Sequence, residues 1–368
     1  MTKLLDLKNH SVIAINQNNY TKEDNYKKVY YLDTDNITNN RINAFLKIDL
    51  TKEKLPSRAK RKCSINSIIY SSVRPNQRHF GIIKEIPKNF LVSTAFIVID
   101  IIDLEKLDPN YLYYYITQDK ITHHLQRIAE CGTSSYPSIT PSDFLNIKIK
   151  LYPLETQQKI ARTLSVLDQK IENNHKINEL LHNFAHKVYE YYFKYKPKNA
   201  KLEQIIIENP KSSIMVKNAQ KTQDKYPFFT SGDNTLSYPK AIIDGRNCFL
   251  NTGGNAGIKF YVGKASYSTD TWCIGANEFS DYLYLLLSSI KTYINQSFFQ
   301  GTSLKHLQKN LLKKYPIYMP SVHEIKKFNQ IIMPLLTLIS INTRTSKKLE
   351  QIRDFLLPLL LKQQVKPQ

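Results

Sequence analysis

One apolar stripe occurs twice in the chain, and it constrains the fold more than any other feature of the sequence. Seven apolar residues recur 168 positions later: Ile160, Leu164, Leu167, Ile171, Leu181, Phe184 and Val188 return as Phe328, Ile332, Leu335, Ile339, Leu349, Ile352 and Leu356. A Gly-Thr-Ser triplet precedes each copy, at residues 132–134 and 301–303. This repeat predicts two units, each built of a globular part followed by a long helix.

The spacing within the stripe predicts a pair of helices. From Ile160 to Ile171 the apolar residues are four, three and four positions apart, which keeps them on one narrow face of a helix. A stretch of about forty residues with this pattern is typical of a coiled coil, and the second copy is the obvious partner. We expect an antiparallel pair with a globular part at each end of a rod of roughly 60 Å. The alternative is that each helix belongs to an ordinary globular core.

Polar residues interrupt the two stripes at corresponding positions. Asn173 and Asn174 lie in the first copy, and Asn342 lies in the second. A buried Asn in a two-helix seam prefers to meet another polar group, so it disfavours slipped registers at some loss of stability. These positions are therefore predicted to set the register of the pair.

The region before each stripe is predicted to contain both helices and strands. Runs rich in β-branched and aromatic residues, at 67–73 and 90–99 before the first stripe and at 248–250 and 258–262 before the second, are typical of short strands. A helix is predicted from residue 111 to 128, with Asp108 and Pro109 as its start signal.

A chain of 368 residues with 42% hydrophobic residues is long enough for two or three domains with real cores. We predict an α+β fold with pseudo-twofold symmetry, in which two mixed α/β domains are separated by two long helices paired as an antiparallel coiled coil. The predicted domains are residues 1–152 and 197–319, and the predicted helical segments are residues 153–196 and 320–368.

The charge balance favours a polyanionic partner. Lys and Arg number 52 against 31 Asp and Glu, which gives a formal net charge of +21. Double-stranded DNA is the first candidate for such a partner. The alternative is codon bias, because Lys, Asn, Ile and Tyr are all abundant, as in an AT-rich genome.

Two regions carry the side chains that DNA binding requires. Between residues 52 and 88, ten Lys or Arg residues stand against two Glu, and guanidinium groups both neutralise phosphates and make bidentate contacts to guanine. The glycine-rich residues 253–257 allow backbone amides to approach a phosphate, and both Gly-Thr-Ser loops place hydroxyls beside a basic or aromatic group. A solvated basic face and a plain tight turn are the alternatives. The predicted DNA-contacting residues are Arg58, Lys60, Arg61, Arg74, Arg78, Thr133, Ser134, Tyr136, Asn251, Gly254, Asn255, Thr302, Ser303 and Lys305.

Motifs of catalysis, metal binding and secretion are not found in the sequence. It contains no GxxxxGK[ST], GxGxxG, HExxH or GxSxG motif. The four cysteines have neither the spacing of a zinc site nor the density of a disulfide scaffold. No apolar run approaches the ~20 residues of a membrane span. We therefore predict a cytoplasmic chain with no catalytic residues and no metal site.

Several segments resemble the specificity subunits of type I restriction-modification enzymes. Residues 55–61, 71–76 and 91–96 look like the first half of one class of target-recognition domain. Residues 153–161 and 167–172 are similar to the central conserved helix of that family, and residues 349–358 to its distal helix. In the second recognition domain only residues 253–257 and 301–303 look familiar.

The resemblance implies a division of labour. Each globular part would recognise one half of a split DNA target, with half-sites about one to one and a half turns apart at ~34 Å per turn. The helices would set that distance and dock two methyltransferase subunits and the restriction subunits. S-adenosylmethionine, ATP and magnesium would bind to those partners, and this chain would bind no cofactor. A stand-alone sequence-specific DNA-binding protein and a coiled-coil adaptor are the alternatives.

Overall fold

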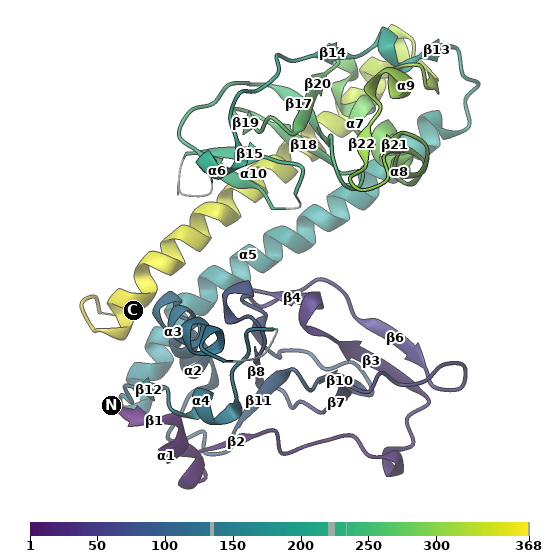
Figure 1. The fold of residues 1–368 in the computed structure, drawn as a ribbon. Coiled ribbons are helices and arrows are strands. Elements are labelled where there is room, and N and C mark those ends of the chain that lie inside the picture. The colour runs from purple at the N-terminus through teal and green to yellow at the C-terminus, as the bar shows by residue number, and fades with distance from the viewer. Residues whose placement is uncertain (133–135, 220–224, 233, 367–368) are drawn as a thin grey trace. The chain divides into compact units, whose positions relative to one another are not determined.

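The computed structural model describes residues 1–132, 136–219, 225–232 and 234–366. The chain divides into two compact units (Figure 1): unit 1 comprises Met1–Gln169 and Leu349–Gln368, and unit 2 comprises Lys170–Lys348. Each unit contains one globular part together with a portion of both long helices. The predicted division of the chain into two globular domains and two distinct helical segments, 153–196 and 320–368, stays a prediction.

Unit 1 contains two four-stranded sheets. One has the strand order β6-β3-β10-β7, formed by β3 (Lys28–Leu32), β6 (Leu46–Asp49), β7 (Ala59–Arg61) and β10 (Phe90–Ser93). The other has the order β2-β11-β8-β9, formed by β2 (Ile13–Ile15), β8 (Ile68–Ser71), β9 (Phe80–Ile82) and β11 (Phe96–Ile101). Strand β10 is parallel to β3, and the other neighbours are antiparallel. Two short pairs join β1 (Thr2–Lys3) to β12 (Lys148–Ile149) and β4 (Ile37–Thr38) to β5 (Arg41–Ile42).

The helices of unit 1 correct one prediction. They are α1 (Leu4–Asn9), α2 (Pro109–Ile116), α3 (Asp119–Glu130) and α4 (Pro141–Leu145). Asp108 caps α2 as predicted, since its carboxylate accepts the Tyr111 N–H at 2.8 Å. The single helix predicted to reach residue 128 is wrong, because α2 ends where Thr117 and Gln118 donate side-chain hydrogen bonds to carbonyl groups of its last turn. The run 90–99 likewise forms two strands, β10 and β11, separated by a turn at Thr94 and Ala95.

Unit 2 repeats one four-stranded sheet of unit 1 and, among the described residues, three of the four strands of the other sheet. Its four-stranded sheet has the order β14-β20-β17-β18, formed by β14 (Ile207–Glu208), β17 (Arg246–Asn251), β18 (Ile258–Val262) and β20 (Thr271–Gly275). Its second sheet has the order β16-β15-β19, formed by β15 (Tyr226–Phe229), β16 (Leu236–Tyr238) and β19 (Ser266–Tyr267), with β15 parallel to β19. Strands β13 (Ala200–Lys201) and β23 (Pro316–Ile317) form a pair, as do β21 (Phe299–Gln300) and β22 (His306–Leu307). The remaining helices are α6 (Val216–Ala219), α7 (Ser280–Ser289), α8 (Lys291–Ser297) and α9 (Lys309–Lys313). The predicted tandem repeat is confirmed.

The two long helices pair antiparallel. Helix α5 (Leu154–Tyr189) continues into a π-helical turn at Glu190–Lys194, and α10 spans Val322–Leu361. In unit 1, Arg353 of α10 bonds to Asp168 of α5. In unit 2 the polar interruptions meet across the pair, because Asn174 bonds to Ser346 and Asn342 bonds to Asn178. Numbering falls along one helix as it rises along the other, so the predicted antiparallel pairing and its polar register are confirmed.

All but two of the predicted seam residues are buried or half-buried. Ile160, Leu164, Ile171, Phe328 and Ile332 are buried, and Leu167, Leu181, Val188, Leu335, Ile339, Leu349 and Leu356 are half-buried. Phe184 is 51% exposed and Ile352 is 46% exposed, so their placement in the seam is wrong. Two heptads beyond Ile171 lead to Ala185, which is buried, and one heptad beyond Ser346 leads to Arg353. Phe184 and Ile352 each lie one residue out of phase.

The ends of the long helices also belong to the globular cores. In unit 1, Ile160 and Leu164 pack in one buried cluster with Tyr111 and Leu112 of α2. In unit 2, Ala185, Tyr189 and Phe193 pack in a cluster with Tyr282 of α7 and Phe328 of α10. The alternative of an ordinary globular core therefore describes the helix ends, and helix-to-helix pairing describes the stretch between them.

Candidate nucleic-acid interface

The predicted basic clusters of unit 1 meet at one turn. This turn, Thr94 and Ala95, joins β10 to β11. The Thr94 N–H donates to the Arg58 carbonyl at 2.8 Å, and the Arg61 guanidinium donates to the Thr94 carbonyl at 3.3 Å. On the other side, Ser72 donates both its N–H and its hydroxyl to the Ala95 carbonyl, each at 2.8 Å. Residues 58–61 and the loop 72–79 therefore flank the same turn.

The segment that follows the first Gly-Thr-Ser triplet joins the same place. The Arg74 N–H donates to the Pro137 carbonyl at 2.9 Å, and the Ile139 N–H donates to the Ser72 carbonyl at 2.8 Å. The Arg74 guanidinium carbon lies 5.2 Å from the centre of the Tyr136 ring. Thr133 and Ser134, which were predicted to contact DNA, lie outside the described residues.

The basic side chains of this region differ in availability. Arg61 is half-buried, and burial lowers the pKa of its guanidinium. Arg78 forms a 2.8 Å ion pair with Asp119. Arg58, Lys60 and Arg74 are exposed, and no carboxylate of the described residues forms an ion pair with any of the three. These three are the side chains of the cluster best able to meet an external anion.

In unit 2 the two predicted loops lie side by side. The Gly254 N–H donates to the Lys305 carbonyl at 2.9 Å, and the Leu307 N–H donates to the Thr252 carbonyl at 3.0 Å. Thr252 donates its N–H at 3.2 Å and its hydroxyl at 2.8 Å to the Asp270 carbonyl. The loops 252–257 and 301–306 thus form one edge, where the side chains of Asn255, Thr302, Ser303 and Lys305 are exposed.

The same set of bonds builds the candidate interface in both units. Ser72 corresponds to Thr252, Arg74 to Gly254, and the acceptor carbonyls of Ala95 and Pro137 to those of Asp270 and Lys305. Sequence reasoning missed Ser72 and Thr252, although each is a hydroxyl residue directly after a strand, β8 or β17. Ser72 and Thr252 are 180 positions apart, whereas Pro137 and Lys305 are 168 positions apart. A comparison of the two halves at one fixed offset therefore does not find all the corresponding residues.

Asn251 supports the glycine-rich loop from below. Its side chain is buried, at 6% exposure, and its amide donates to the Asn255 carbonyl at 3.1 Å. A Cβ atom at Gly257 would overlap the end of the Asn251 side chain and displace it from under the loop. Asn251 was predicted to contact DNA, but its burial assigns it to positioning the loop.

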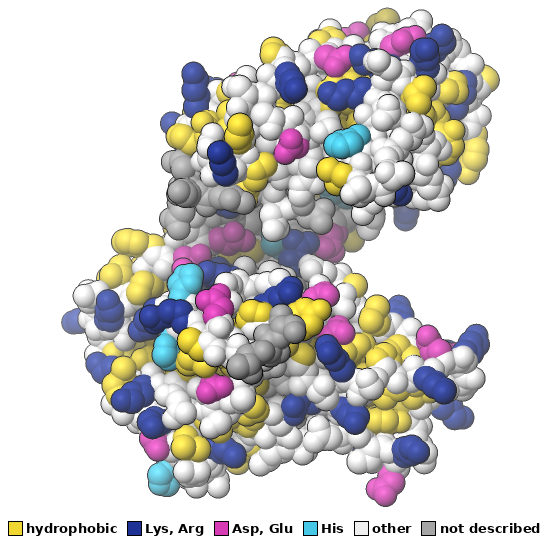
Figure 2. All heavy atoms as spheres, in the orientation of Figure 1, with side chains coloured by type: hydrophobic (Ala, Val, Ile, Leu, Met, Phe, Trp, Pro, Cys, Tyr) yellow, Lys and Arg dark blue, Asp and Glu magenta, His cyan; other side chains and the backbone are white. Residues whose placement is uncertain are grey.

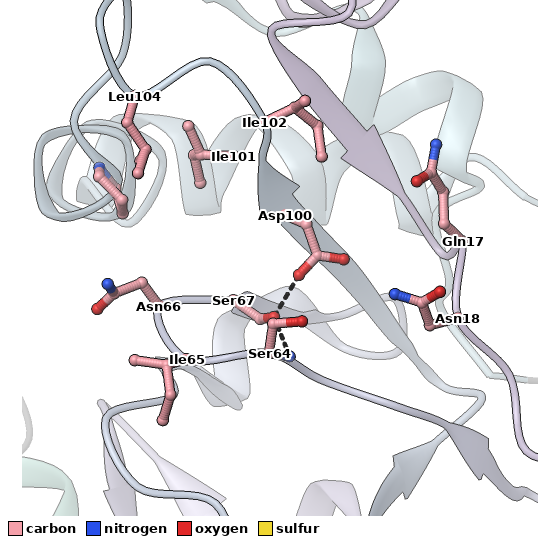
Figure 3. Close-up of a pocket in the computed structure, with 11 residues that line it drawn as sticks. Gln17, Asn18, Ser64, Ile65, Asn66, Ser67, Asp100, Ile101, Ile102 and Leu104 are labelled. Carbon is pink, nitrogen blue, oxygen red and sulfur yellow. Dashed lines mark hydrogen bonds between the residues drawn. The ribbon is translucent and has the colours of Figure 1, made fainter.

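A cavity of about 200 Å³ in unit 1 lies away from these loops. Its polar lining includes Gln17, Asn18, Ser67 and Asp100 (Figure 3), and the Ser67 hydroxyl donates to the Asp100 carboxylate. Asp100 lies near the end of β11, whereas the turn at Thr94 and Ala95 precedes the start of that strand. The cavity contains none of the predicted DNA-contacting residues.

On the face drawn in Figure 2, positive charge is not gathered in one patch. Lys and Arg side chains are scattered over the visible face of each unit, interspersed with fewer acidic side chains. Dispersed charge of this kind attracts a polyanion without selecting a sequence. Among the residues with described placement, no group of three or more His, Cys, Asp or Glu side chains is arranged to hold a metal. No helix in the described ranges is both long and apolar enough to cross a bilayer.

Comparison with known proteins identifies the class to which this chain belongs. The family described as the type I restriction modification DNA specificity domain matches residues 7–183 and 198–351. Because the match covers most of the chain in two copies, the chain belongs to this family. The first copy contains the globular part of unit 1, and the second contains that of unit 2.

Individual relatives agree with this assignment. The specificity subunit of the type I restriction enzyme HindI from Haemophilus influenzae is 30% identical over 169 residues, which span 46% of this chain and 36% of that subunit. The MjaIX specificity subunit from Methanocaldococcus jannaschii is 25% identical over 71% of this chain and 70% of its own length. The crystal structure of the type I restriction-modification S subunit from M. genitalium shares the fold, with a TM-score of 0.59, 15% identity, and coverage of 98% of this chain and 95% of that one.

Proposed function

We propose that this chain is the DNA-recognition subunit of a type I restriction-modification system, and that each unit recognises one half of a bipartite DNA target. The observation that carries the proposal is the duplicated loop edge. In each unit the same backbone bonds join the loop after β8 or β17 to the segment after the Gly-Thr-Ser triplet. Rigid loops on strand ends present side chains at fixed positions, as contact with base edges requires.

The charge of the chain supports DNA as the ligand. A net charge of +21 supplies the salt-dependent attraction to phosphates that underlies non-specific binding. Arg58 and Lys60 are exposed beside the turn at Thr94, where they suit contacts to phosphate. Two linked readers bind cooperatively, because the second engagement is intramolecular. The spacing of the half-sites stays a prediction.

Apolar side chains on the outer faces of the long helices support protein partners. In unit 2, Ile177, Leu180 and Phe184 of α5 are 42%, 68% and 51% exposed, and steps of three and four place them on one face. Helix α10 has a similar exposed stripe at Ile331, Leu338 and Ile341. Exposed stripes of this kind mark docking surfaces. We assign them to methyltransferase and restriction subunits.

The partners then supply the chemistry. S-adenosylmethionine, ATP and magnesium bind to them, and this chain selects the target without catalysing a reaction. Its cysteines, Cys63, Cys131, Cys248 and Cys273, form no disulfide. We place the complex in the reducing cytoplasm, where thiols persist.

The test is selection of bound sequences from a randomised duplex library, with the chain alone and co-purified with its methyltransferase subunits. We expect the complex to select a bipartite sequence, with binding that weakens steeply as salt rises. Tight sequence-specific binding by the chain alone would indicate a stand-alone DNA-binding protein. Binding that does not respond to salt, or no binding, would indicate an adaptor.

A paired substitution tests the docking surface. Leu180→Glu should abolish co-purification with the methyltransferase subunits, because it places a charge on the exposed apolar stripe. Glu179→Lys, exposed on a different face of α5, should leave assembly intact. Equal assembly of both variants would count against this face as the docking surface.

A further inference from the structure

We propose that Arg74 recognises a guanine in the half-site of unit 1 and that Tyr136 positions its guanidinium. The inference rests on the proposed function and deepens it, because it assigns a base to one side chain. It also predicts an asymmetry between the half-sites, because Gly254 takes the place of Arg74 in unit 2.

The backbone around Arg74 is fixed. Arg74 has a φ of 46°, in the left-handed region that side chains rarely adopt, and its N–H is bonded to the Pro137 carbonyl. The next turn is closed by a 2.9 Å bond from the Gln77 N–H to the Arg74 carbonyl. A strained conformation persists only where its surroundings hold it, so this loop is rigid at Arg74.

Helix α3 holds the same loop from the other side. The Asn76 N–H donates to the side-chain carbonyl of the buried Gln126 at 3.1 Å, and Gln126 in turn donates to Glu130 at 2.7 Å. The ion pair of Arg78 with Asp119 adds a second attachment to α3. Arg78 is therefore occupied in holding the loop, and Arg74 is not.

The Arg74 side chain is prepared for a planar ligand. Its guanidinium lies over the Tyr136 ring, and Tyr136 is 61% exposed, so the pair lies at the surface. A cation–π contact of this kind orients the guanidinium plane while leaving the N–H donors along its edge available. An oriented arginine matches the O6 and N7 acceptors of guanine with two parallel hydrogen bonds. Arg58 and Lys60 have no aromatic support of this kind among the described contacts.

The corresponding position in unit 2 cannot make this contact. The Gly254 N–H donates the equivalent backbone bond to the Lys305 carbonyl, but glycine has no side chain. The exposed groups around it are the amide of Asn255, the hydroxyls of Thr302 and Ser303, and the ammonium of Lys305. We infer that guanine recognition through this loop position is confined to the half-site of unit 1.

The experiment compares variants of the full complex by selection from a randomised duplex library, followed by titration of single-base variants of the selected target. Arg74→Ala should reduce the preference for guanine at one position of one half-site by about 5- to 150-fold, the range of one bidentate base contact. All other positions should keep their preferences. Tyr136→Phe keeps the ring and should retain the preference for guanine, whereas Tyr136→Leu should weaken it to a smaller extent than Arg74→Ala.

The controls separate the possible failures. Arg127→Ala removes an exposed arginine of α3 and should leave every base preference unchanged. The inference is overturned if Arg74→Ala weakens binding to all sequences evenly, which would make Arg74 a phosphate contact, or if the change falls in the half-site of unit 2. If the wild-type complex selects no bipartite sequence, the proposed function itself fails, and that result is visible without any variant. Thermal unfolding of each variant confirms that the fold is retained.

Discussion

Asn174 of α5 donates a 3.1 Å hydrogen bond to the Ser346 hydroxyl of α10, and both side chains are buried, at 3% and 2% exposure. One turn further, Asn342 donates to Asn178 at 2.9 Å. Because a slipped register would separate these buried polar groups from their partners, both layers favour the observed register.

A double-mutant cycle tests this register lock. Asn174→Ala should lower the free energy of unfolding by about 1–3 kcal/mol, because it leaves the Ser346 hydroxyl without its partner. Ser346→Ala alone should also destabilise the fold, because it leaves the Asn174 amide without its partner. The Asn174→Ala, Ser346→Ala double variant should therefore lose less stability than the sum of the two single variants, since it removes both polar groups. Urea denaturation followed by circular dichroism measures each variant. Simple additivity of the single substitutions would show that the two residues are not coupled.

A second polar contact lies within unit 1, where Asp168 joins the two helices to α2. Its carboxylate accepts from Arg353 at 2.7 Å and from the Tyr114 hydroxyl at 2.6 Å. Asp168→Asn should therefore cost about 1.5–3 kcal/mol, the range for hydrogen bonds to a charged group. Asp354 also contacts Arg353 but is 61% exposed, so Asp354→Asn should change stability little. Equal losses for the two variants would argue against a special role for Asp168.

The glycines of the two Gly-Thr-Ser triplets should differ in their tolerance of a side chain. Gly301 has a φ of 142°, and a Cβ there would overlap the Leu304 carbonyl. Gly301→Ala should disturb the loop 301–306 at a cost of about 1–3 kcal/mol and weaken binding to the half-site of unit 2. A Cβ at Gly132 would lie 3.4 Å from the Ala129 carbonyl, so Gly132→Ala should be tolerated. Thermal unfolding and titration of the separate half-sites distinguish the two outcomes.

The hydroxyl of Thr252 should tighten the loop edge of unit 2. Thr252→Val removes one of its two bonds to the Asp270 carbonyl while preserving the shape, so a loss of about 0.5–1.5 kcal/mol is expected. Thr252→Ser keeps the hydroxyl and should retain the stability of the loop. Hydrogen exchange of the Gly254 amide is the direct measurement, because its bond to Lys305 lies in the same edge. Unchanged exchange in Thr252→Val would show that the backbone bonds suffice.

The helix pair was predictable from the sequence because its signal is periodic. Ile160, Leu164 and Ile171 keep their phase through a continuous α-helix, so their burial follows from spacing alone. Beyond Asn174 the predicted positions depart from the buried face of α5, because polar residues occupy the seam there. Phe184, next to the buried Ala185, looks equally suitable in the sequence. Polar seam positions carry no hydrophobic signal, and only their partners on α10 show that they are buried.

The candidate interface was predictable in its parts but not in its assembly. The arginines of residues 58–78 and the glycines of residues 253–257 stand out by composition. Their meeting at single turns depends on backbone bonds between residues far apart, such as Arg74 with Pro137, which leave no mark on side-chain identity. The burial of Asn251 was not foreseeable for the same reason, since an amide serves equally well under a loop or on it.

The histidine pair of α5 should make the stability of unit 2 depend on pH. Burial lowers the pKa of both His182 and His186 below the usual value. The charge of His186 lowers the pKa of His182 further, whereas Glu190 partly offsets the effect of burial on His186. The folded state therefore binds these protons less readily than the unfolded state. Their contribution to stability is complete above the unfolded pKa of about 6.5 and is lost as pH falls through that value toward the lowered folded pKa.

The expected result is a urea midpoint that falls between pH 7.5 and 5 and that falls less in a His182→Asn, His186→Gln double variant. The pKa of Glu324 is lowered to about 2, chiefly by the backbone hydrogen bond from Ser321, so this group stays ionised in the window. Burial raises the pKa of Asp281, but this group is present in both proteins, so the difference between them reports the histidines. Protonation matters at this place because His182 lies beside Tyr284, 3.4 Å from its hydroxyl, within the core that joins α5 to α7. A wild-type midpoint that does not change with pH, or one that changes equally in the double variant, would assign the pH dependence to other groups.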